Sequence, residues 1–267
     1  MNARALLDKI KNAVAPLIFV PRCSACLTVV PSKNMALCPE CMRKYELESK
    51  CLCRGCKRSH RYCTCKIEND GSKLALVHIT AYDIRRSSVS KSMILNLKDN
   101  KFPGAFDFLA EELYETVKMR YARLFEGGNV IVTHVPRSDK AQKKAGHDQS
   151  KEIAERFGRL SGAPAVTLFE NISETQQKQL TAEQRRENAN ESYRFCDENV
   201  SLAGKVLLMI DDITTTGATL SACARLAKDA YAKAVIALVC ARVDRESSVD
   251  ENDYLIYGEE EENEYWN

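Results

Sequence analysis

Two adjacent aspartates followed by a threonine-rich turn are the residues of this sequence best suited to chemistry. Asp211 and Asp212 come directly after residues 206–210, a continuous apolar run of strand length. Such a run is typical of a parallel strand that is buried on both faces. Adjacent carboxylates at the end of a strand can accept hydrogen bonds from vicinal hydroxyls, as on a ribose, and can stabilise a developing positive charge.

The turn after the aspartates predicts a phosphate site. Backbone amides that open the next helix, with the hydroxyls of Thr215, Thr216 and Thr219, can bind a phosphate group. Gly217 allows the backbone to approach a ligand closely. A phosphorylated sugar fits the carboxylates and the turn together, whereas ordinary helix capping by Asp and Thr is the structural alternative.

The flanking segments predict the elements that position this turn. Apolar residues recur at helical spacing from Leu220 to Ala227, and residues 233–241 have the pattern of a second buried strand. This βαβ unit places the turn at the carboxyl end of a parallel strand, where open α/β sheets bind ligands. We therefore expect an α/β fold with a mostly parallel sheet flanked by helices. The sequence has neither a Walker P-loop nor a GxGxxG turn, so no motif supports an ATPase or a dinucleotide oxidoreductase.

Nine of the twelve cysteines lie between Cys23 and Cys65. A disulfide framework requires an oxidising compartment, and the N-terminus shows no secretory signal, so we expect a cytoplasmic protein with structural zinc. The spacing of two C-x2-C pairs suits one tetrahedral zinc ion without an open position. These four ligands are Cys23, Cys26, Cys38 and Cys41.

A second cysteine set offers more ligands than one zinc ion needs. Its favoured members are Cys53, Cys56, Cys63 and Cys65, with Cys51 or His60 as alternatives. Basic residues alternate with these ligands and indicate either contact with a nucleic-acid backbone or a solvated face. The basic residues are Lys50, Arg54, Lys57, Arg58 and Arg61.

Composition and charge divide the chain into three parts. Hydrophobic residues make up 45% and charged residues 28%, as in globular proteins, and no apolar run is long enough to cross a bilayer. Residues 1–70 are expected to hold a helix over residues 6–20 and the zinc-ribbon-like module. Residues 71–245 are expected to form the α/β domain. Residues 246–267 form an acidic tail that we expect to be solvated and disordered.

The string from Asp211 to Thr219 closely resembles the motif of type I phosphoribosyltransferases that binds 5-phosphoribosyl 1-pyrophosphate (PRPP). Together with the cysteines, it resembles the ComF family of competence-associated, amidophosphoribosyltransferase-like proteins with an N-terminal zinc ribbon. Residues 133–149 are similar to the strand, Val-Pro turn and basic loop of that family, and residues 177–193 to its Gln-x-x-Leu-Ser and Arg-Arg-x-Asn segments. Lys98 resembles a lysine that the family carries before its basic turn.

This resemblance implies a division of roles around PRPP. Asp211 and Asp212 would hold the ribose hydroxyls. The 5′-phosphate would lie on Thr214, Thr215, Thr216, Gly217, Ala218 and Thr219. The pyrophosphate, which carries magnesium into the site, would face Pro136, Arg137 and Ser138. Residues 172–195 would form a mobile hood in which Arg185 neutralises the departing pyrophosphate, and hood closure would exclude water from the oxocarbenium-like state.

The chain departs from the family pattern in the basic loop. Where the family has Arg-Gly-Phe-Asn-Gln, residues 145–149 read Ala-Gly-His-Asp-Gln. The pyrophosphate side is therefore predicted to be weaker, and His147 is either an exposed loop residue or a base for an acceptor. Three functions stay open: a phosphoribosyltransferase with an unidentified acceptor, a protein that binds single-stranded DNA with competence proteins during DNA uptake, and a non-catalytic PRPP sensor.

Overall fold

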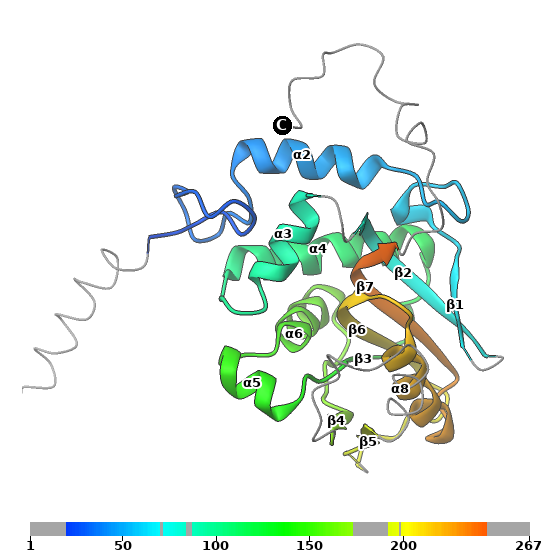
Figure 1. Ribbon diagram of the computed structural model, residues 1–267. Coiled ribbons are helices and arrows are strands. Elements are labelled where there is room, and N and C mark those ends of the chain that lie inside the picture. Colours follow the sequence, from blue (N-terminus) through cyan, green and yellow to red (C-terminus); the bar gives the residue numbers. More distant parts are fainter. Residues whose placement is uncertain (1–19, 70–71, 84–86, 173–191, 198, 245–267) are drawn as a thin grey trace, which may run out of the picture.

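The computed structural model describes residues 20–69, 72–83, 87–172, 192–197 and 199–244 (Figure 1). Three predicted features fall outside these ranges, wholly or for the most part. They are the helix over residues 6–20, the hood with Arg185, and the acidic tail.

A five-stranded sheet forms the centre of the molecule, in the order β1-β2-β7-β6-β3. The strands are β1 (Lys66–Asn69), β2 (Ser72–Asp83), β3 (Val130–His134), β6 (Val206–Thr214) and β7 (Ala234–Asp244). β1 pairs antiparallel with β2, and the other three pairings of this sheet are parallel. The predicted mostly parallel α/β sheet is confirmed, including the βαβ unit of β6, α8 (Ala218–Asp229) and β7.

Consecutive apolar side chains of the central strands point to opposite faces of the sheet, so both faces are apolar and helices cover both. Leu208 and Leu238 face α4 (Pro103–Arg120) and α6 (Gln149–Ser161) in one core cluster. Leu207 and Val239 point the other way and pack against α8. Each central strand is thus buried on both sides, as its continuous apolar run predicts. Among the described helices, none is long and apolar enough to cross a bilayer.

The cysteine-rich segment packs directly on this domain. Its helix α2 (Pro39–Lys50) lies over α3 (Val89–Asn96) and α4 as an outer layer (Figure 1). The buried Tyr45 ring meets Phe108 edge-on, with 5.1 Å between centroids, and the Tyr45 hydroxyl donates to Glu112 Oε2 at 3.2 Å. Aromatic pairs in this geometry are attractive beyond the area that they bury.

A carboxylate from α2 also caps α3. Glu48 accepts from the backbone amides of Val89 at 2.6 Å and Ser90 at 2.9 Å, which satisfies donors that the first turn of a helix leaves unpaired. The predicted domain limit at residue 70 falls between β1 and β2, which are paired strands of one sheet. Core residues of the cysteine-rich segment and of the α/β domain therefore form one continuous cluster.

Four short elements complete the described part of the chain. The 3-10 helix η1 (His60–Tyr62) lies against β2, and α5 (Asp139–Ala145) follows β3. β4 (Phe169–Asn171) and β5 (Tyr193–Phe195) pair antiparallel in a separate ribbon. β4 ends directly before the predicted hood, and β5 forms the last three residues of the hood.

Candidate functional site

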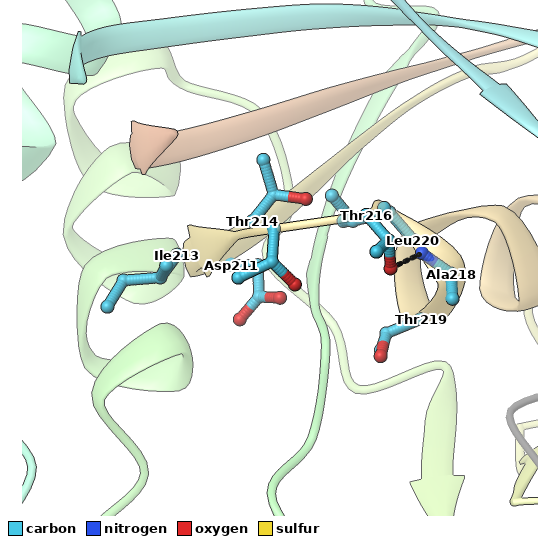
Figure 2. Close-up of a pocket in the computed structure, with 9 residues that line it drawn as sticks. Asp211, Ile213, Thr214, Thr216, Ala218, Thr219 and Leu220 are labelled. Atoms are coloured by element: carbon cyan, nitrogen blue, oxygen red, sulfur yellow. Dashed lines mark hydrogen bonds between the residues drawn. The ribbon is translucent and has the colours of Figure 1, made fainter. Parts of the chain in front are cut away.

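A small cavity lies where β6 ends and α8 begins (Figure 2). Its volume is about 60 Å³. Since a bound water requires about 10–15 Å³ by the same measure, the cavity has room for a group of roughly five atoms, the size of a phosphate. Its lining consists of Asp211, Ile213, Thr214, Thr215, Thr216, Gly217, Ala218, Thr219 and Leu220.

The turn requires a glycine at position 217 for two reasons. Gly217 has a φ of +73°, in the left-handed region that disfavours residues with a side chain. A Cβ at this position would also lie 2.3 Å from Cγ2 of Ile67 in β1. The Ala218 amide donates to Thr216 Oγ1 at 3.4 Å (Figure 2). The first amides of α8 precede the hydrogen-bond ladder of the helix, so they and the positive end of the helix dipole favour an anion at the cavity.

Asp211 lines this cavity, Asp212 follows it in β6, and α6 contacts both side chains. Asp211 Oδ1 accepts from Ser150 Oγ at 3.1 Å, and Asp212 Oδ2 accepts from Gln149 Nε2. Burial, and then the negative charge of Asp212, raise the pKa of the Asp211 carboxyl well above its ordinary value. A neighbouring carboxyl pair of this kind favours ligands that donate hydrogen bonds, such as sugar hydroxyls.

The predicted pyrophosphate residues lie beside the aspartates because β3 and β6 are parallel neighbours. Pro136, Arg137 and Ser138 directly follow β3. Arg137 Nη1 donates to Gln149 Oε1 at 2.8 Å and to the carbonyl oxygen of Lys98 at 3.1 Å. A continuous set of hydrogen bonds therefore runs from Lys98 through Arg137 and Gln149 to Asp212.

Asp148 fixes the loop that carries Arg137. This 6% exposed carboxylate accepts from the backbone amide of Arg137 at 2.9 Å and from Gln142 Nε2 at 3.3 Å. Its other oxygen accepts from the amides of Ser150 and Lys151 and so caps α6. The loop after β3 and the start of α6 are thereby one hydrogen-bonded unit.

His147 is buried, so the expectation that it is an exposed loop residue is wrong. It is 7% exposed and packs edge-on against Phe106, 5.8 Å between ring centroids. Nε2 lies 2.8 Å from the carbonyl oxygen of Leu97, and Nδ1 lies 3.0 Å from that of Ala145. A neutral imidazole donates to one of these carbonyl oxygens, and the contact with Leu97 is the shorter of the two. This contact ties the loop to the end of α3, so the geometry assigns His147 to tethering.

Tyr193 reaches the cavity from the β4-β5 ribbon. Its hydroxyl accepts from Asn171 Nδ2 at 3.1 Å and hydrogen bonds with Thr219. Burial raises the pKa of Tyr193, so its hydroxyl stays protonated. Tyr193 of β5 therefore lies directly beside Thr219 of the turn.

The sequence alone gave no role to Gln149 and Ser150, although both contact the aspartates. They lie 63 and 61 residues away from their carboxylate partners, so only the packing of α6 on β6 brings them together. The available signal was the Asp-Gln-Ser string of residues 148–150, an N-cap that opens an amphipathic helix.

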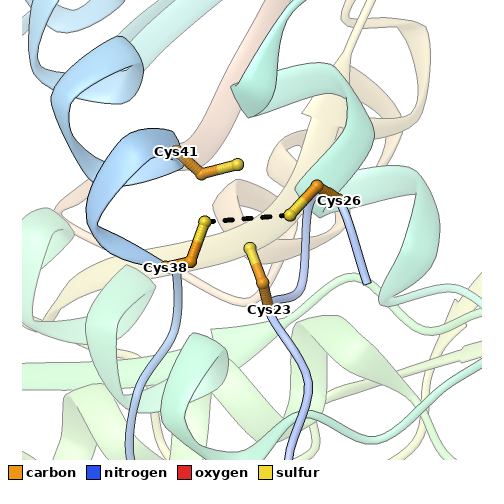
Figure 3. Close-up of side chains that lie close together, drawn as sticks. All are labelled: Cys23, Cys26, Cys38 and Cys41. Carbon is orange, nitrogen blue, oxygen red and sulfur yellow. Dashed lines mark hydrogen bonds between the residues drawn. The ribbon is translucent and has the colours of Figure 1, made fainter. Parts of the chain in front are cut away.

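The first thiol cluster consists of Cys23, Cys26, Cys38 and Cys41, whose sulfurs all lie within 4.8 Å of one another (Figure 3). The Cys26 and Cys38 sulfurs are 3.8 Å apart. Tetrahedral zinc with Zn–S bonds of about 2.3 Å requires a separation of about 3.8 Å between sulfurs. The cluster therefore fits a structural zinc ion without rearrangement.

The second thiol cluster consists of Cys53, Cys56, Cys63 and Cys65, again within 4.8 Å. Pairs of its sulfurs lie 3.4–3.7 Å apart. The two alternative ligands lie outside this group: Cys51 donates to the Leu47 carbonyl oxygen, and the His60 ring packs on His78 at 5.1 Å. The favoured ligand set is thus the one that the geometry brings together.

The two clusters share the same knuckle geometry. Leu27 and Lys57, each following the second cysteine of a pair, have φ values of +64° and +56°. Their amides donate to the carbonyl oxygens of Cys23 and Cys53 at 3.0 and 2.8 Å. Burial acts to raise the pKa of Cys26 and of Cys56, but hydrogen bonds outweigh it and lower each pKa to about 6. Thiols that ionise this readily are suited to metal binding.

Comparison with known protein families assigns the chain to one of them. The family model of the phosphoribosyl transferase domain matches residues 120–267, just over half of the chain, and the chain belongs to this family. Its fold is accordingly of the type I phosphoribosyltransferase kind, as predicted. No curated protein matches the chain.

Several solved structures resemble the chain at low identity. An adenine phosphoribosyltransferase is 16% identical, with 56% of this chain and 75% of that chain covered and a TM-score of 0.38. A hypoxanthine phosphoribosyltransferase from Staphylococcus aureus is 13% identical, with coverage of 54% and 68% and a TM-score of 0.32. A purine phosphoribosyltransferase from Pyrococcus horikoshii Ot3 is 14% identical, with coverage of 55% and 92% and a TM-score of 0.31.

Proposed function

We propose that this chain is a PRPP-binding phosphoribosyltransferase of the ComF type, whose acceptor is unidentified. The observation that carries the proposal is the cavity of phosphate size at the opening of α8, with Asp211 and Asp212 at the end of β6. This arrangement offers anion-binding amides at one end and hydroxyl-binding carboxylates at the other. Membership of the phosphoribosyl transferase domain family supports it independently.

In this proposal the two ends of the site bind different parts of PRPP. The turn of residues 214–219 binds the 5′-phosphate, and the two aspartates hold the ribose and stabilise positive charge that develops at its anomeric carbon. Arg137, with Pro136, Ser138 and Lys98 beside it, faces the pyrophosphate. Magnesium supplies charge neutralisation on the pyrophosphate when it is bound, and Arg185 is assigned to the same task from the hood.

Zinc in both thiol clusters has a structural role in this proposal. Eight thiols fill both coordination spheres, so neither site keeps a position for a reacting water. We propose the cytoplasm as the compartment, because a reducing environment keeps zinc-binding cysteines as thiols. Residues 1–70 then serve as a zinc module fixed to the catalytic domain, and residues 246–267 as a charged tail.

The test is a calorimetric titration of the zinc-loaded full chain with PRPP, with and without magnesium. Saturable binding that magnesium strengthens is the expected result. The matched variant changes Asp211→Asn and Asp212→Asn together, which keeps the volume of both side chains and removes their charge. Binding should be lost while the far-ultraviolet circular dichroism stays unchanged, and PRPP affinity that survives this variant would remove the aspartates from the site.

Turnover separates the enzyme from the PRPP sensor. A phosphoribosyltransferase releases pyrophosphate when PRPP is consumed, either by an acceptor or slowly by water. Pyrophosphate release by the wild type that disappears in the Asp211→Asn, Asp212→Asn variant supports the enzyme. Tight PRPP binding with no release across a panel of nucleobase, amine and amide acceptors supports the sensor.

A second candidate function is contact with single-stranded nucleic acid through the second thiol cluster. Lys50, Lys57 and Arg58 are exposed around it, and Tyr62 presents 54% of its surface for stacking. Each phosphate contact contributes a salt dependence, so affinity for a single-stranded oligonucleotide should fall steeply between 50 and 200 mM salt. Oligonucleotide binding that Lys57→Ala with Arg58→Ala leaves unchanged would contradict this role.

A further inference from the structure

The side chain of Gln149 lies between the two ends of the proposed site. Gln149 is the first residue of α6 and is 2% exposed. Its Nε2 donates to Asp212 Oδ2, and its Oε1 accepts from Arg137 Nη1 at 2.8 Å. One buried amide therefore contacts both a carboxylate assigned to the ribose and a guanidinium assigned to the pyrophosphate.

The chemistry of the partners fixes the orientation of this amide. An ionised carboxylate can only accept hydrogen bonds, and a guanidinium can only donate them. The Gln149 NH2 group must therefore face Asp212, and its oxygen must face Arg137. A flipped amide would place a donor against a donor and an acceptor against an acceptor, which is costly at a buried position.

Arg137 is held in place without a charged partner for its side chain. Its Nη1 donates to two neutral oxygens, Gln149 Oε1 and the carbonyl oxygen of Lys98. Within the part of the chain that the structure describes, Nε and Nη2 of Arg137 donate to no carboxylate. Phosphate oxygens are stronger acceptors for a guanidinium than neutral carbonyls.

We propose that Gln149 is the positioning residue that couples the ribose and pyrophosphate ends of the PRPP site, an inference that rests on the function proposed above. Gln149 orients Asp212 toward the ribose hydroxyls and Arg137 toward the pyrophosphate as one hydrogen-bonded unit. Loss of either partner leaves one end of the buried amide unpaired, so the amide turns and the remaining partner loses its orientation.

Ribose 5-phosphate tests this coupling because it lacks the pyrophosphate. In the proposed site Arg137 has no direct contact with this ligand. If the coupling holds, Arg137→Ala weakens ribose 5-phosphate binding by about tenfold or more, as expected when a hydrogen bond to a charged group is lost. Gln149→Met, which keeps length and removes both polar ends, weakens it to a similar extent.

Non-additivity distinguishes the coupling from a general effect of charge. The double variant should bind ribose 5-phosphate no more weakly than the weaker single variant, because both substitutions break the same unit. A purely electrostatic effect of Arg137 on an anionic ligand would add to the effect of Gln149→Met. Thr116→Val, which removes a buried hydroxyl on α4 away from the site, is the matched control and should leave the affinity unchanged.

The outcomes separate this inference from the proposed function. A wild type that binds neither PRPP nor ribose 5-phosphate overturns both. If the wild type binds PRPP, two results overturn only the coupling. One is an unchanged ribose 5-phosphate affinity in Arg137→Ala, and the other is additive effects in the double variant. If Gln149→Met does not fold, judged by circular dichroism, Gln149→Leu replaces it in both the single and the double variant.

Discussion

At the residue scale, the dominant feature is a pair of carboxylates that the fold stabilises poorly. Asp211 Oδ1 accepts from Ser150 Oγ and from the Asp212 amide, yet burial and the adjacent charge still raise the pKa of Asp211. Buried like charges cost free energy, so such a pair is typical of a binding site rather than of a stability device. A ligand that donates hydrogen bonds to the pair relieves this cost.

This cost predicts how stability changes with pH. The pKa of Asp211 is raised in the folded state above the unfolded value of about 3.9, so both states are protonated below that pH and Asp211→Asn has little effect there. As pH rises, the wild type must either ionise the buried carboxyl or hold its proton, and it loses stability relative to the variant. We expect Asp211→Asn to raise the melting temperature by about 3 °C or more at pH 8.

The measurement is thermal unfolding of wild type and Asp211→Asn at pH 5 and pH 8, both with excess zinc so that metal effects cancel. Asp99→Asn, at an exposed position after α3, is the control and should change little at either pH. A gain that is the same at both pH values, or larger at pH 5, would contradict the assignment of a raised pKa.

At the element scale, β1 and the turn before α8 are in unusually close contact. Ile67 in β1 lies where a Cβ at Gly217 would be, and it follows Cys65 of the second thiol cluster by two residues. The second thiol cluster and the turn of residues 214–217 are thus linked by the Ile67 side chain. The sequence did not predict this contact, because β1 is only four residues long and Ile67 is its single apolar residue.

Two glycines with the same backbone conformation allow a controlled test of this contact. Gly217 and Gly162 have φ values of +73° and +72°, but a Cβ at Gly162 meets no atom within 4 Å. Gly162→Ala should cost only the backbone strain, about 1 kcal/mol. Gly217→Ala adds the clash with Ile67, so we expect a loss at least about twice as large, together with weaker PRPP binding.

Urea unfolding and PRPP titration measure these two effects. Addition of Ile67→Ala to Gly217→Ala should recover part of the lost stability, because it removes the atoms that clash. Equal destabilisation by Gly162→Ala and Gly217→Ala would show that the Ile67 contact is not tight.

What the sequence could predict at this scale was local. Residues 206–219 and residues 234–241 each form one continuous stretch of sequence. Hydrophobic periodicity and turn chemistry were therefore sufficient to predict the βαβ unit and its turn. Gln149 and Ser150 were missed because their role depends on contacts across more than 60 residues. His147 was expected to be exposed because loop residues usually are, whereas the end of α3 buries it.

At the scale of the whole molecule, the cysteine-rich segment of residues 23–65 contributes to the hydrophobic core. Tyr45, Cys41 and Leu37 belong to the same buried cluster as Phe106 and Leu109 of α4. The Asn96 side chain also donates to the carbonyl oxygens of Ser24 and Ala25 at 2.8 and 3.0 Å. The segment rich in cysteines therefore covers apolar surface that the α/β domain would otherwise expose.

This continuity predicts that the α/β domain does not fold alone. A chain that begins at residue 66 would lose the Tyr45 ring that packs on Phe108 and the cap that Glu48 gives α3. We expect it to be insoluble or to lack a cooperative unfolding transition, while the full chain unfolds cooperatively. A soluble, cooperatively folded fragment would show that the two parts are independent domains.

The two thiol clusters should differ in their effect on ligand binding. Metal analysis is expected to give two zinc ions per full chain, also in Cys51→Ser, and one in Cys38→Ser or in Cys56→Ser. Only Cys56→Ser should weaken PRPP binding, because the second cluster is linked to Gly217 through Ile67. Equal effects of both substitutions on PRPP affinity would argue for a general loss of stability instead.

The most direct test of the central claim is a crystal structure of the zinc-loaded full chain with PRPP and magnesium. We predict the 5′-phosphate in the cavity of residues 211–220, within hydrogen-bond distance of the amides that open α8. The ribose hydroxyls should lie on Asp211 and Asp212, and the pyrophosphate beside Arg137. A ligand bound elsewhere on the chain, or an empty cavity in crystals grown at saturating PRPP, would contradict the account.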